Sequence, residues 1–156
     1  MKKKFSLCGV TVFAFLVIAG VSMIVSPAMA KGNWLTDYTA ALAQAKKENR
    51  PVLIDFTGSD WCGWCIKLDK ETFTQPAFQE FAKKNLVLFE ADFPRGIAQT
   101  SAVKKQNNEL QTKFAVEGFP TQILVDSNGK EIARHEGYLE GGPKGFIDWV
   151  NKSLKK

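Results

Sequence analysis

The segment Trp61-Cys62-Gly63-Trp64-Cys65 constrains this chain more than any other feature, because it lies just after a strand-like apolar run. A Cys-x-x-Cys pair serves as a redox dithiol, as half of a zinc site or as a haem attachment point. Haem attachment requires a histidine after the second cysteine, where Ile66 stands. Zinc requires four soft or imidazole ligands, and beyond the pair the chain has only Cys8 and His135. The pattern therefore predicts a redox dithiol and no metal site.

The sequence around the pair predicts a strand, a turn and a helix. The run 51–56 is apolar and β-branched after an initial proline, and 57–60 has the composition of a turn. A helix is expected over 62–72, with Cys62 at its start. There the unpaired backbone N–H groups and the helix dipole favour an anion, which lowers the pKa of a cysteine thiol. Cys65, one turn further on, is within reach to resolve a mixed disulfide.

The order of motifs resembles that of the thioredoxin-fold disulfide oxidoreductases over roughly residues 34–156. The matching segments are Asp55-Phe56, Trp61-Cys62-Gly63-Trp64-Cys65, Gly118-Phe119-Pro120-Thr121 and Asp126-Ser127-Asn128-Gly129-Lys130. The longer segment Phe56-Thr57-Gly58-Ser59-Asp60-Trp61-Cys62, with Phe93-Pro94 farther on, resembles in particular the exported DsbH-like periplasmic disulfide reductases. The resemblance implies an α/β thioredoxin fold, in which helices flank a central mixed β-sheet, with an extra N-terminal helix.

By this resemblance Cys62 is the attacking thiol and Cys65 is the resolving thiol, and the two form a redox-active disulfide. Pro120 is the cis-proline that faces them, whereas an ordinary proline would simply begin a strand. A cis bond would let Phe119 present its backbone to an extended substrate, which could pair with it as an added strand.

Asp55 ends an apolar strand, where a buried carboxylate is costly. It is a candidate proton acceptor for Cys65, with a pKa raised by burial, and a turn hydrogen bond is the structural alternative. Two positions depart from thioredoxin. One extra residue separates Asp55 from Cys62, and Leu88 is expected near the strand position where thioredoxin has a lysine.

Two tryptophans flank the expected nucleophile, and an apolar rim for substrate is favoured over a place in the core. The expected substrate-binding residues are Trp61, Gly63, Trp64, Phe119 and Pro120. Asp60 is expected to be an exposed turn residue and His135 a surface residue, whereas Trp34 and Trp149 are expected in the core.

The remaining elements follow from apolar periodicity and turn residues. A helix is expected over 34–50, capped by Thr36, and Pro76 begins another. Further elements are expected as a strand over 86–92, a helix over 103–114, a hairpin of 121–125 with 131–134, and a closing helix over 146–154. Strands that alternate with helices indicate an α/β layer fold.

The N-terminus is typical of a cleaved signal peptide. Lys2, Lys3 and Lys4 precede an apolar run over 5–25, and Ala28-Met29-Ala30 is a small-x-small cleavage site. The expected domains are a signal peptide, residues 1–30, and a thioredoxin-like domain, residues 31–156. An uncleaved anchor is the alternative, since about 20 apolar residues span a bilayer.

Cleavage would remove three lysines, so that 18 basic residues would face 16 acidic ones, for a net charge of +2 instead of +5. This balance gives no sign of nucleic-acid binding. The expected protein is a periplasmic or otherwise exported monomer that acts on disulfide-containing exported proteins and draws electrons from a membrane thiol donor. No cofactor is expected.

The residues between the cysteines indicate the direction of the reaction. Strongly oxidising relatives carry a histidine there, which stabilises the reduced thiolate. Gly63 and Trp64 carry no charge, so a reductase of disulfides is favoured. A disulfide oxidant or isomerase, and a non-enzymatic carrier for metal or haem maturation, stay open as alternatives.

Overall fold

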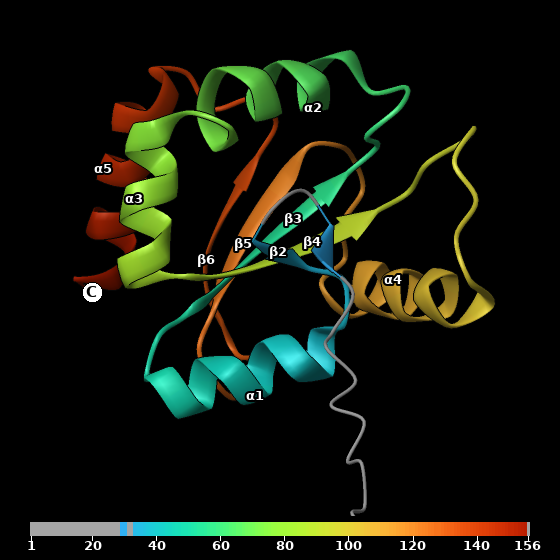
Figure 1. The fold of residues 1–156 in the computed structure, drawn as a ribbon, viewed down its shortest axis with the longest axis horizontal. Coiled ribbons are helices and arrows are strands. Elements are labelled where there is room, and N and C mark those ends of the chain that lie inside the picture. The colour runs from blue at the N-terminus through green and yellow to red at the C-terminus, as the bar shows by residue number, and fades with distance from the viewer. Residues whose placement is uncertain (1–28, 31–32, 156) are drawn as a thin grey trace, which may run out of the picture.

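The computed structural model describes residues 29–30 and 33–155 (Figure 1). The strands are β1 Met29–Ala30, β2 Trp34–Leu35, β3 Val52–Thr57, β4 Val87–Asp92, β5 Thr121–Val125 and β6 Glu131–Glu136. The helices are α1 Tyr38–Glu48, α2 Gly63–Leu68, the π-helix η1 Asp69–Phe73, α3 Pro76–Asn85, α4 Ser101–Lys113 and α5 Gly142–Leu154. The predicted signal peptide lies outside these residues except for β1, which ends at the predicted cleavage site.

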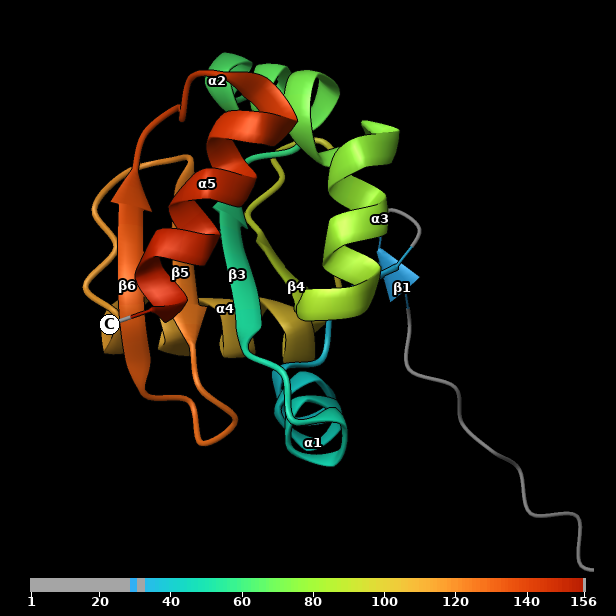
Figure 2. The ribbon, with the colours of Figure 1, turned by 90° about the vertical axis from the view of Figure 1, so that its left-hand side faces the viewer.

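Within the described residues, six strands form one mixed sheet in the order β1-β2-β4-β3-β5-β6. Strand β3 is parallel to β4 and antiparallel to β5, so it is paired along both edges. All six residues of β3 are buried, which explains its nearly unbroken apolar sequence. Helices lie on both faces of the sheet (Figures 1 and 2). The predicted α/β thioredoxin fold is confirmed.

The alternating side chains of the strands divide the core into two clusters, one on each face. One cluster joins the sheet to α1 and α4 through Ile54, Phe89, Ala41, Leu110 and Ile123, among others. The other joins it to α2, α3 and α5 through Leu53, Leu68, Phe78, Leu124 and Phe146. The second face therefore carries the helix that follows Cys62, and Figure 2 shows α3 and α5 side by side in front of it.

The first helix is shorter than predicted, because the residues before it belong to the sheet. Leu35 pairs with Phe89 of β4, and Trp34 is buried, as expected. Asp37, and not Thr36, caps α1: its carboxylate accepts a hydrogen bond from the backbone N–H of Ala40. The predicted helix at the N-terminal side of the domain is present.

The other predicted elements lie close to their expected positions. The helix after Cys62 changes from α2 into η1 at Asp69, and α5 begins at Gly142, four residues before the predicted start at Phe146. Trp149, expected in the core, is only half-buried, although its ring packs against that of Phe146. In the part of the chain that the structure describes, no helix has both the length and the apolar character to cross a membrane.

Candidate active site

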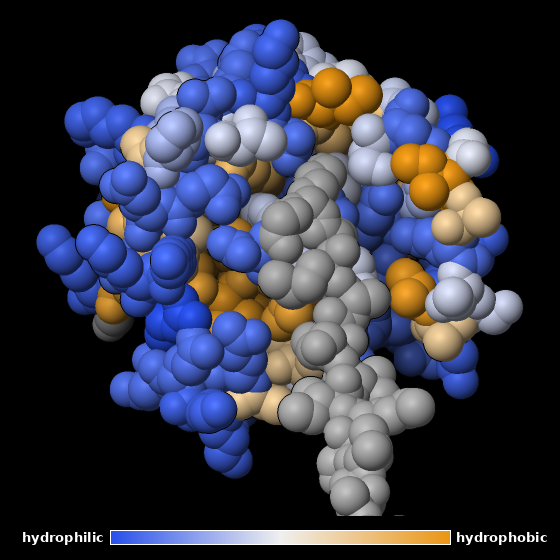
Figure 3. Space-filling model, in the orientation of Figure 1, coloured by the Kyte–Doolittle hydropathy of each residue, from blue (hydrophilic) through white to orange (hydrophobic). Residues whose placement is uncertain are grey.

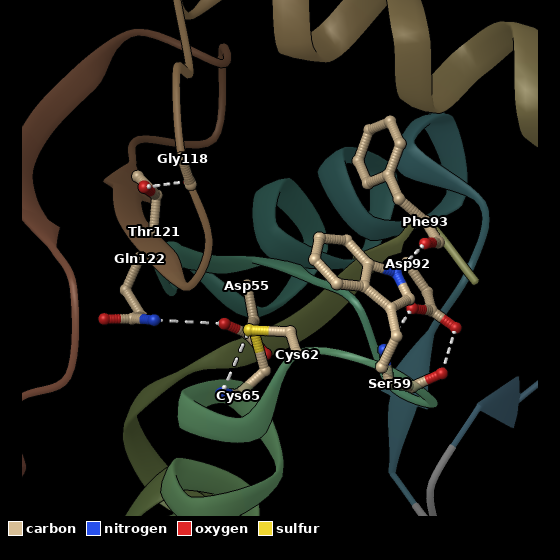
Figure 4. Close-up of a disulfide and its surroundings, with 10 residues drawn as sticks. Asp55, Ser59, Cys62, Cys65, Asp92, Phe93, Gly118, Thr121 and Gln122 are labelled. Carbon is tan, nitrogen blue, oxygen red and sulfur yellow. Dashed lines mark hydrogen bonds between the residues drawn. A yellow bond between two sulfur atoms is a disulfide. The ribbon is translucent and has the colours of Figure 1, made fainter. Parts of the chain in front are cut away.

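A disulfide joins Cys62 and Cys65, whose Cα atoms lie 5.2 Å apart (Figure 4). Cys62 is the N-cap of α2, and its Sγ accepts a hydrogen bond from the backbone N–H of Cys65 at 3.2 Å. The predicted position of Cys62 at the helix start is confirmed. A sulfur atom at this end of a helix faces unpaired backbone N–H groups, and these stabilise a thiolate when the disulfide is reduced.

The turn between β3 and α2 is fixed to the end of β4. Asp92 accepts hydrogen bonds from the backbone N–H of Ser59 at 2.9 Å and from its hydroxyl at 2.6 Å (Figure 4). The backbone carbonyl of Asp92 in turn accepts from the Asn107 side chain of α4 at 2.8 Å. Nothing in the sequence pairs Ser59 with Asp92, because the contact depends on the parallel register of β3 and β4.

The Phe119–Pro120 bond is cis, as expected. The carbonyl of Pro120 accepts a hydrogen bond from the backbone N–H of Gly137, and the Thr121 hydroxyl donates to the carbonyl of Gly118. A groove of about 320 Å³ runs past this bond. It is lined by Trp64, Phe119, Pro120, Gly137, Tyr138 and Glu140. Two of the expected substrate-binding aromatics, Trp64 and Phe119, thus share one groove.

Trp61 and Trp64 are both exposed, and neither belongs to the core. Trp61 contacts the Phe119 ring edge to face, with 6.0 Å between centroids. Trp64 instead packs against Tyr138, with 5.6 Å between centroids. Gly63, between the cysteines, is exposed and has open space where a side chain would lie.

Asp55 is buried on the face of the sheet that α2 covers, and the Gln122 amide donates a hydrogen bond to it at 3.2 Å (Figure 4). The register places Glu90 of β4 beside Asp55, whereas Leu88 lies beside Leu53. Leu88, expected near the position of the thioredoxin lysine, is therefore not the register neighbour of this carboxylate. A second buried acid is there instead.

Gln122 and Glu90 were not identified from the sequence, although a glutamine and a glutamate inside apolar strands are a visible signal. Gln122 is fully buried, and its Oε1 atom has no hydrogen-bond partner in the described residues. Its register neighbour is His135, which was expected at the surface. His135 is half-buried, and its Nε2 atom is buried without a hydrogen-bond partner in the same part of the chain. A row of polar groups thus crosses the sheet from Glu90 through Asp55 and Gln122 to His135.

The donors that could hold a metal are few. Among the described residues, no group of three or more His, Cys, Asp or Glu side chains is arranged to bind a metal ion. A Cys-x-x-Cys pair at a helix start, in a thioredoxin fold with a cis-proline that shares a groove with Trp64, has the chemistry of thiol-disulfide exchange. The class of protein defined by the fold and the site is therefore that of the thiol-disulfide oxidoreductases.

Comparison with known proteins agrees with this class. A family model described as a thioredoxin-like domain matches residues 38–153. The disulfide bond reductase DsbH of Chlamydia pneumoniae is 36% identical over 118 residues, which are 76% of this chain and 70% of DsbH. A solved structure titled DsbH oxidoreductase has 32% sequence identity and a TM-score of 0.74, with 95% of each chain covered.

The chain belongs to the thioredoxin-like family, and within it to the thiol-disulfide oxidoreductases of the DsbH and DsbD type. The thiol:disulfide interchange protein DsbD of Actinobacillus pleuropneumoniae serotype 5b (strain L20) is 34% identical over 107 residues, which are 67% of this chain. The match covers only 16% of DsbD, so the similarity is to one part of that protein.

Proposed function

We propose that this chain is an exported reductase of protein disulfides, in which Cys62 attacks and Cys65 resolves. The observation that carries the proposal is the Cys62–Cys65 disulfide at the start of α2, in a chain 36% identical to a disulfide bond reductase. The uncharged residues Gly63 and Trp64 support the reducing direction, because no cation between the cysteines stabilises the reduced thiolate.

In the proposed reaction, the Cys62 thiolate attacks one sulfur of a substrate disulfide. A bond forms between the two sulfur atoms, the substrate S–S bond breaks, and the released substrate thiolate takes up a proton. Cys65 then loses its proton and attacks the Cys62 sulfur, so that the Cys62–Cys65 disulfide forms and the second substrate thiolate leaves and is protonated. Two electrons thus pass from the dithiol to the substrate, and the two substrate thiolates take up their protons from water. A thiol donor at the membrane then reduces the disulfide of the enzyme through the same exchange.

The proton of Cys65 is proposed to pass to Asp55. Asp55 is buried on the face covered by α2 and has a hydrogen bond from Gln122, so its carboxylate is held in one orientation. Burial and the neighbouring Glu90 both disfavour a second negative charge at this place. A carboxyl in such a position is suited to take a proton when Cys65 attacks and to return it when the dithiol is restored.

The substrate is proposed to lie in the groove beside Pro120. The groove combines the rings of Trp64, Phe119 and Tyr138 with Pro120, and Trp64 lies between the two cysteines in the sequence. An extended peptide can place apolar side chains on such rings while its backbone pairs with the chain before Pro120. Gly63 leaves space for the approach of the peptide, because nothing lies within 4 Å of the side-chain position there.

Export rests on the N-terminal sequence. Residues 1–30 are proposed to be a signal peptide that is removed, and residues 31–156 to form the periplasmic domain. N-terminal sequencing of the exported chain is expected to begin at Lys31.

Reduction of insulin tests the proposed roles. With dithiothreitol as the electron source, Cys62→Ser is expected to reduce the catalysed rate to the uncatalysed level, because the attacking sulfur is lost. Cys65→Ser is expected to accumulate mixed disulfides, which mass spectrometry detects, because the resolving sulfur is lost. The opposite pattern in the two variants would contradict the assignment of roles. A reduction potential near the ~−120 mV of the strong oxidant DsbA would contradict the direction.

A further inference from the structure

A short loop beside the disulfide, residues 93–97, is joined to the turn before Cys62 by contacts between residues 32 to 36 positions apart. We call it the flanking loop. The Asp60 carboxylate accepts hydrogen bonds from the backbone N–H of Arg95, at 3.0 Å, and of Gly96, at 2.6 Å. The Trp61 indole N–H donates to the carbonyl of Phe93 at 2.7 Å. The flanking loop therefore has a defined position relative to the attacking cysteine.

Trp61 is itself fixed from several directions. Its ring lies against the backbone of Gly58, where an added Cβ would come within 2.5 Å of it. Its edge-to-face contact with Phe119 joins it to the cis-proline loop, and Phe119 stacks on Phe93 with 5.0 Å between centroids. The guanidinium carbon of Arg95 lies 3.9 Å from the centroid of a Trp61 ring. Arg95 is thus supported by an indole that is held in place.

The Arg95 side chain is exposed and available for an anion. Within the described residues no ion pair involves it, and the adjacent acid, Asp60, directs its oxygens at backbone N–H groups. A guanidinium is planar and carries five N–H donors. When one face rests on an aromatic ring, the edge with the donors stays open and can bind a carboxylate through two parallel hydrogen bonds.

Large apolar side chains are exposed both on the flanking loop and on the segment that carries the two cysteines, residues 61–66. Six large apolar side chains are exposed in the described part of the chain. Three of them, Trp61, Trp64 and Ile66, lie within residues 61–66, and Ile97 belongs to the flanking loop. Figure 3 shows separate hydrophobic patches on an otherwise hydrophilic face, some of them where the segment between β4 and α4 lies in Figure 1. Exposed apolar side chains next to a reactive group are typical of a docking surface.

We propose that the flanking loop is a docking surface for protein substrates that carry an acidic residue close to the reacting cystine, and that Arg95 binds the carboxylate of that residue. The proposal rests on the proposed function, because the partner is a disulfide substrate of the same site. The Arg95 guanidinium rests on the ring of Trp61, the residue before Cys62, and Ile97 offers an apolar contact on the same loop. Phe119 joins this surface to the Trp64 groove, because its ring contacts Trp61 and also lines the groove.

The experiment compares two peptides with the same cystine, flanked in one by glutamate and in the other by lysine. The ratio of kcat/KM for the glutamate peptide to that for the lysine peptide is measured in the unaltered protein, in Arg95→Gln and in Arg95→Glu. We expect a ratio of about three to ten in the unaltered protein, a ratio near one in Arg95→Gln, and a ratio below one in Arg95→Glu. Lys152→Gln is the control, because it removes the same charge from an exposed position on α5.

Both peptides react with the same dithiol, so a general loss of activity in a variant lowers both kcat/KM values and leaves their ratio unchanged. An equal ratio in the unaltered protein and in Arg95→Gln would overturn the proposal. A fall in the ratio of the same size in Lys152→Gln would overturn it as well, because long-range charge would then explain the preference. If the unaltered protein reduces neither peptide, the proposed function fails and this surface loses its basis.

Discussion

The two tryptophans that flank Cys62 are three residues apart, yet their surroundings differ. Trp61 is 37% exposed and is held by a hydrogen bond to Phe93, by the Phe119 ring and by the guanidinium of Arg95. Trp64 is 59% exposed, and its ring meets only the Tyr138 ring and the Lys67 ammonium among the ring contacts of the described residues. Trp61 therefore forms a fixed part of the surface near the disulfide, whereas Trp64 is an exposed ring beside an open groove.

This difference separates two tasks that a thiol-disulfide oxidoreductase must combine. A fixed surface, such as that around Trp61, can recognise one chemical group, because its side chains lose little conformational entropy when a substrate binds. An exposed ring beside a groove can adjust to different side chains. Selectivity is therefore expected on the Trp61 side and tolerance on the Trp64 side.

The largest expected difference is in stability. Trp61→Ala removes a hydrogen bond, an aromatic pair and a cation–π contact, so we expect it to lower the free energy of unfolding of the oxidised protein by about 2–3 kcal/mol. Trp64→Ala removes an exposed ring and should cost about 0.5 kcal/mol. Urea unfolding measures both. Equal losses in the two variants would remove the distinction between a fixed and an adaptable side.

A smaller difference in stability is expected between alanine substitutions at two glycines near Cys62. Gly58→Ala would place its Cβ within 2.5 Å of the Trp61 ring, so the ring must move, and we expect a loss of about 1–2 kcal/mol. Gly63→Ala meets nothing within 4 Å and lies at the start of α2, so no loss of stability is expected. The indole N–H signal of Trp61 in NMR spectra should shift in Gly58→Ala and stay in Gly63→Ala. An unshifted signal in Gly58→Ala would show that Trp61 is not confined.

The local part of this arrangement could be predicted from the sequence. A strand, a turn and a helix that begins at Cys62 follow from neighbouring residues, because propensity and capping act over a few positions. The resemblance to the thioredoxin family supplied the cis bond before Pro120, which the structure confirms. The exposure of Trp61 and Trp64 was also expected, and both rings are exposed.

The contacts between distant segments could not be predicted, because they depend on strand register. Asp60 was expected only as an exposed turn residue, but it also holds the backbone of Arg95, 35 positions away. Glu90 lies beside Asp55 because β3 and β4 pair at one register, and a shift of two positions would have placed Leu88 there. Similarly, Trp34 was predicted to lie in a helix. In the structure it pairs with Ala30 of β1, and a local sequence pattern does not reveal such a pairing.

The smallest expected effect is a difference in pH dependence between the two sides of the disulfide. Backbone N–H groups of Arg95 and then Gly96 hold the pKa of Asp60 below its ordinary value. On the other side, the Tyr138 hydroxyl donates a hydrogen bond to Glu71, and this contact is the main cause of a raised Tyr138 pKa. The first contact needs a charged carboxylate and the second needs a protonated hydroxyl.

The two shifts have opposite signs, so the two sides should loosen at opposite ends of the pH scale. The pKa of Asp60 is lowered by folding, so its contribution is present above the unfolded value of ~3.9 and is lost as the pH falls through the folded pKa. The pKa of Tyr138 is raised by folding, so its contribution is present below ~10 and is lost as the pH rises through the folded pKa.

Both groups are near the surface, so we expect local changes in NMR spectra and only a small change in stability. The amide signals of Arg95 and Gly96 should shift at acid pH while the Tyr138 ring signals stay, and the reverse should hold at alkaline pH. Asp60→Asn should abolish the acid transition at these two amides, and its persistence in that variant would assign the transition to another group.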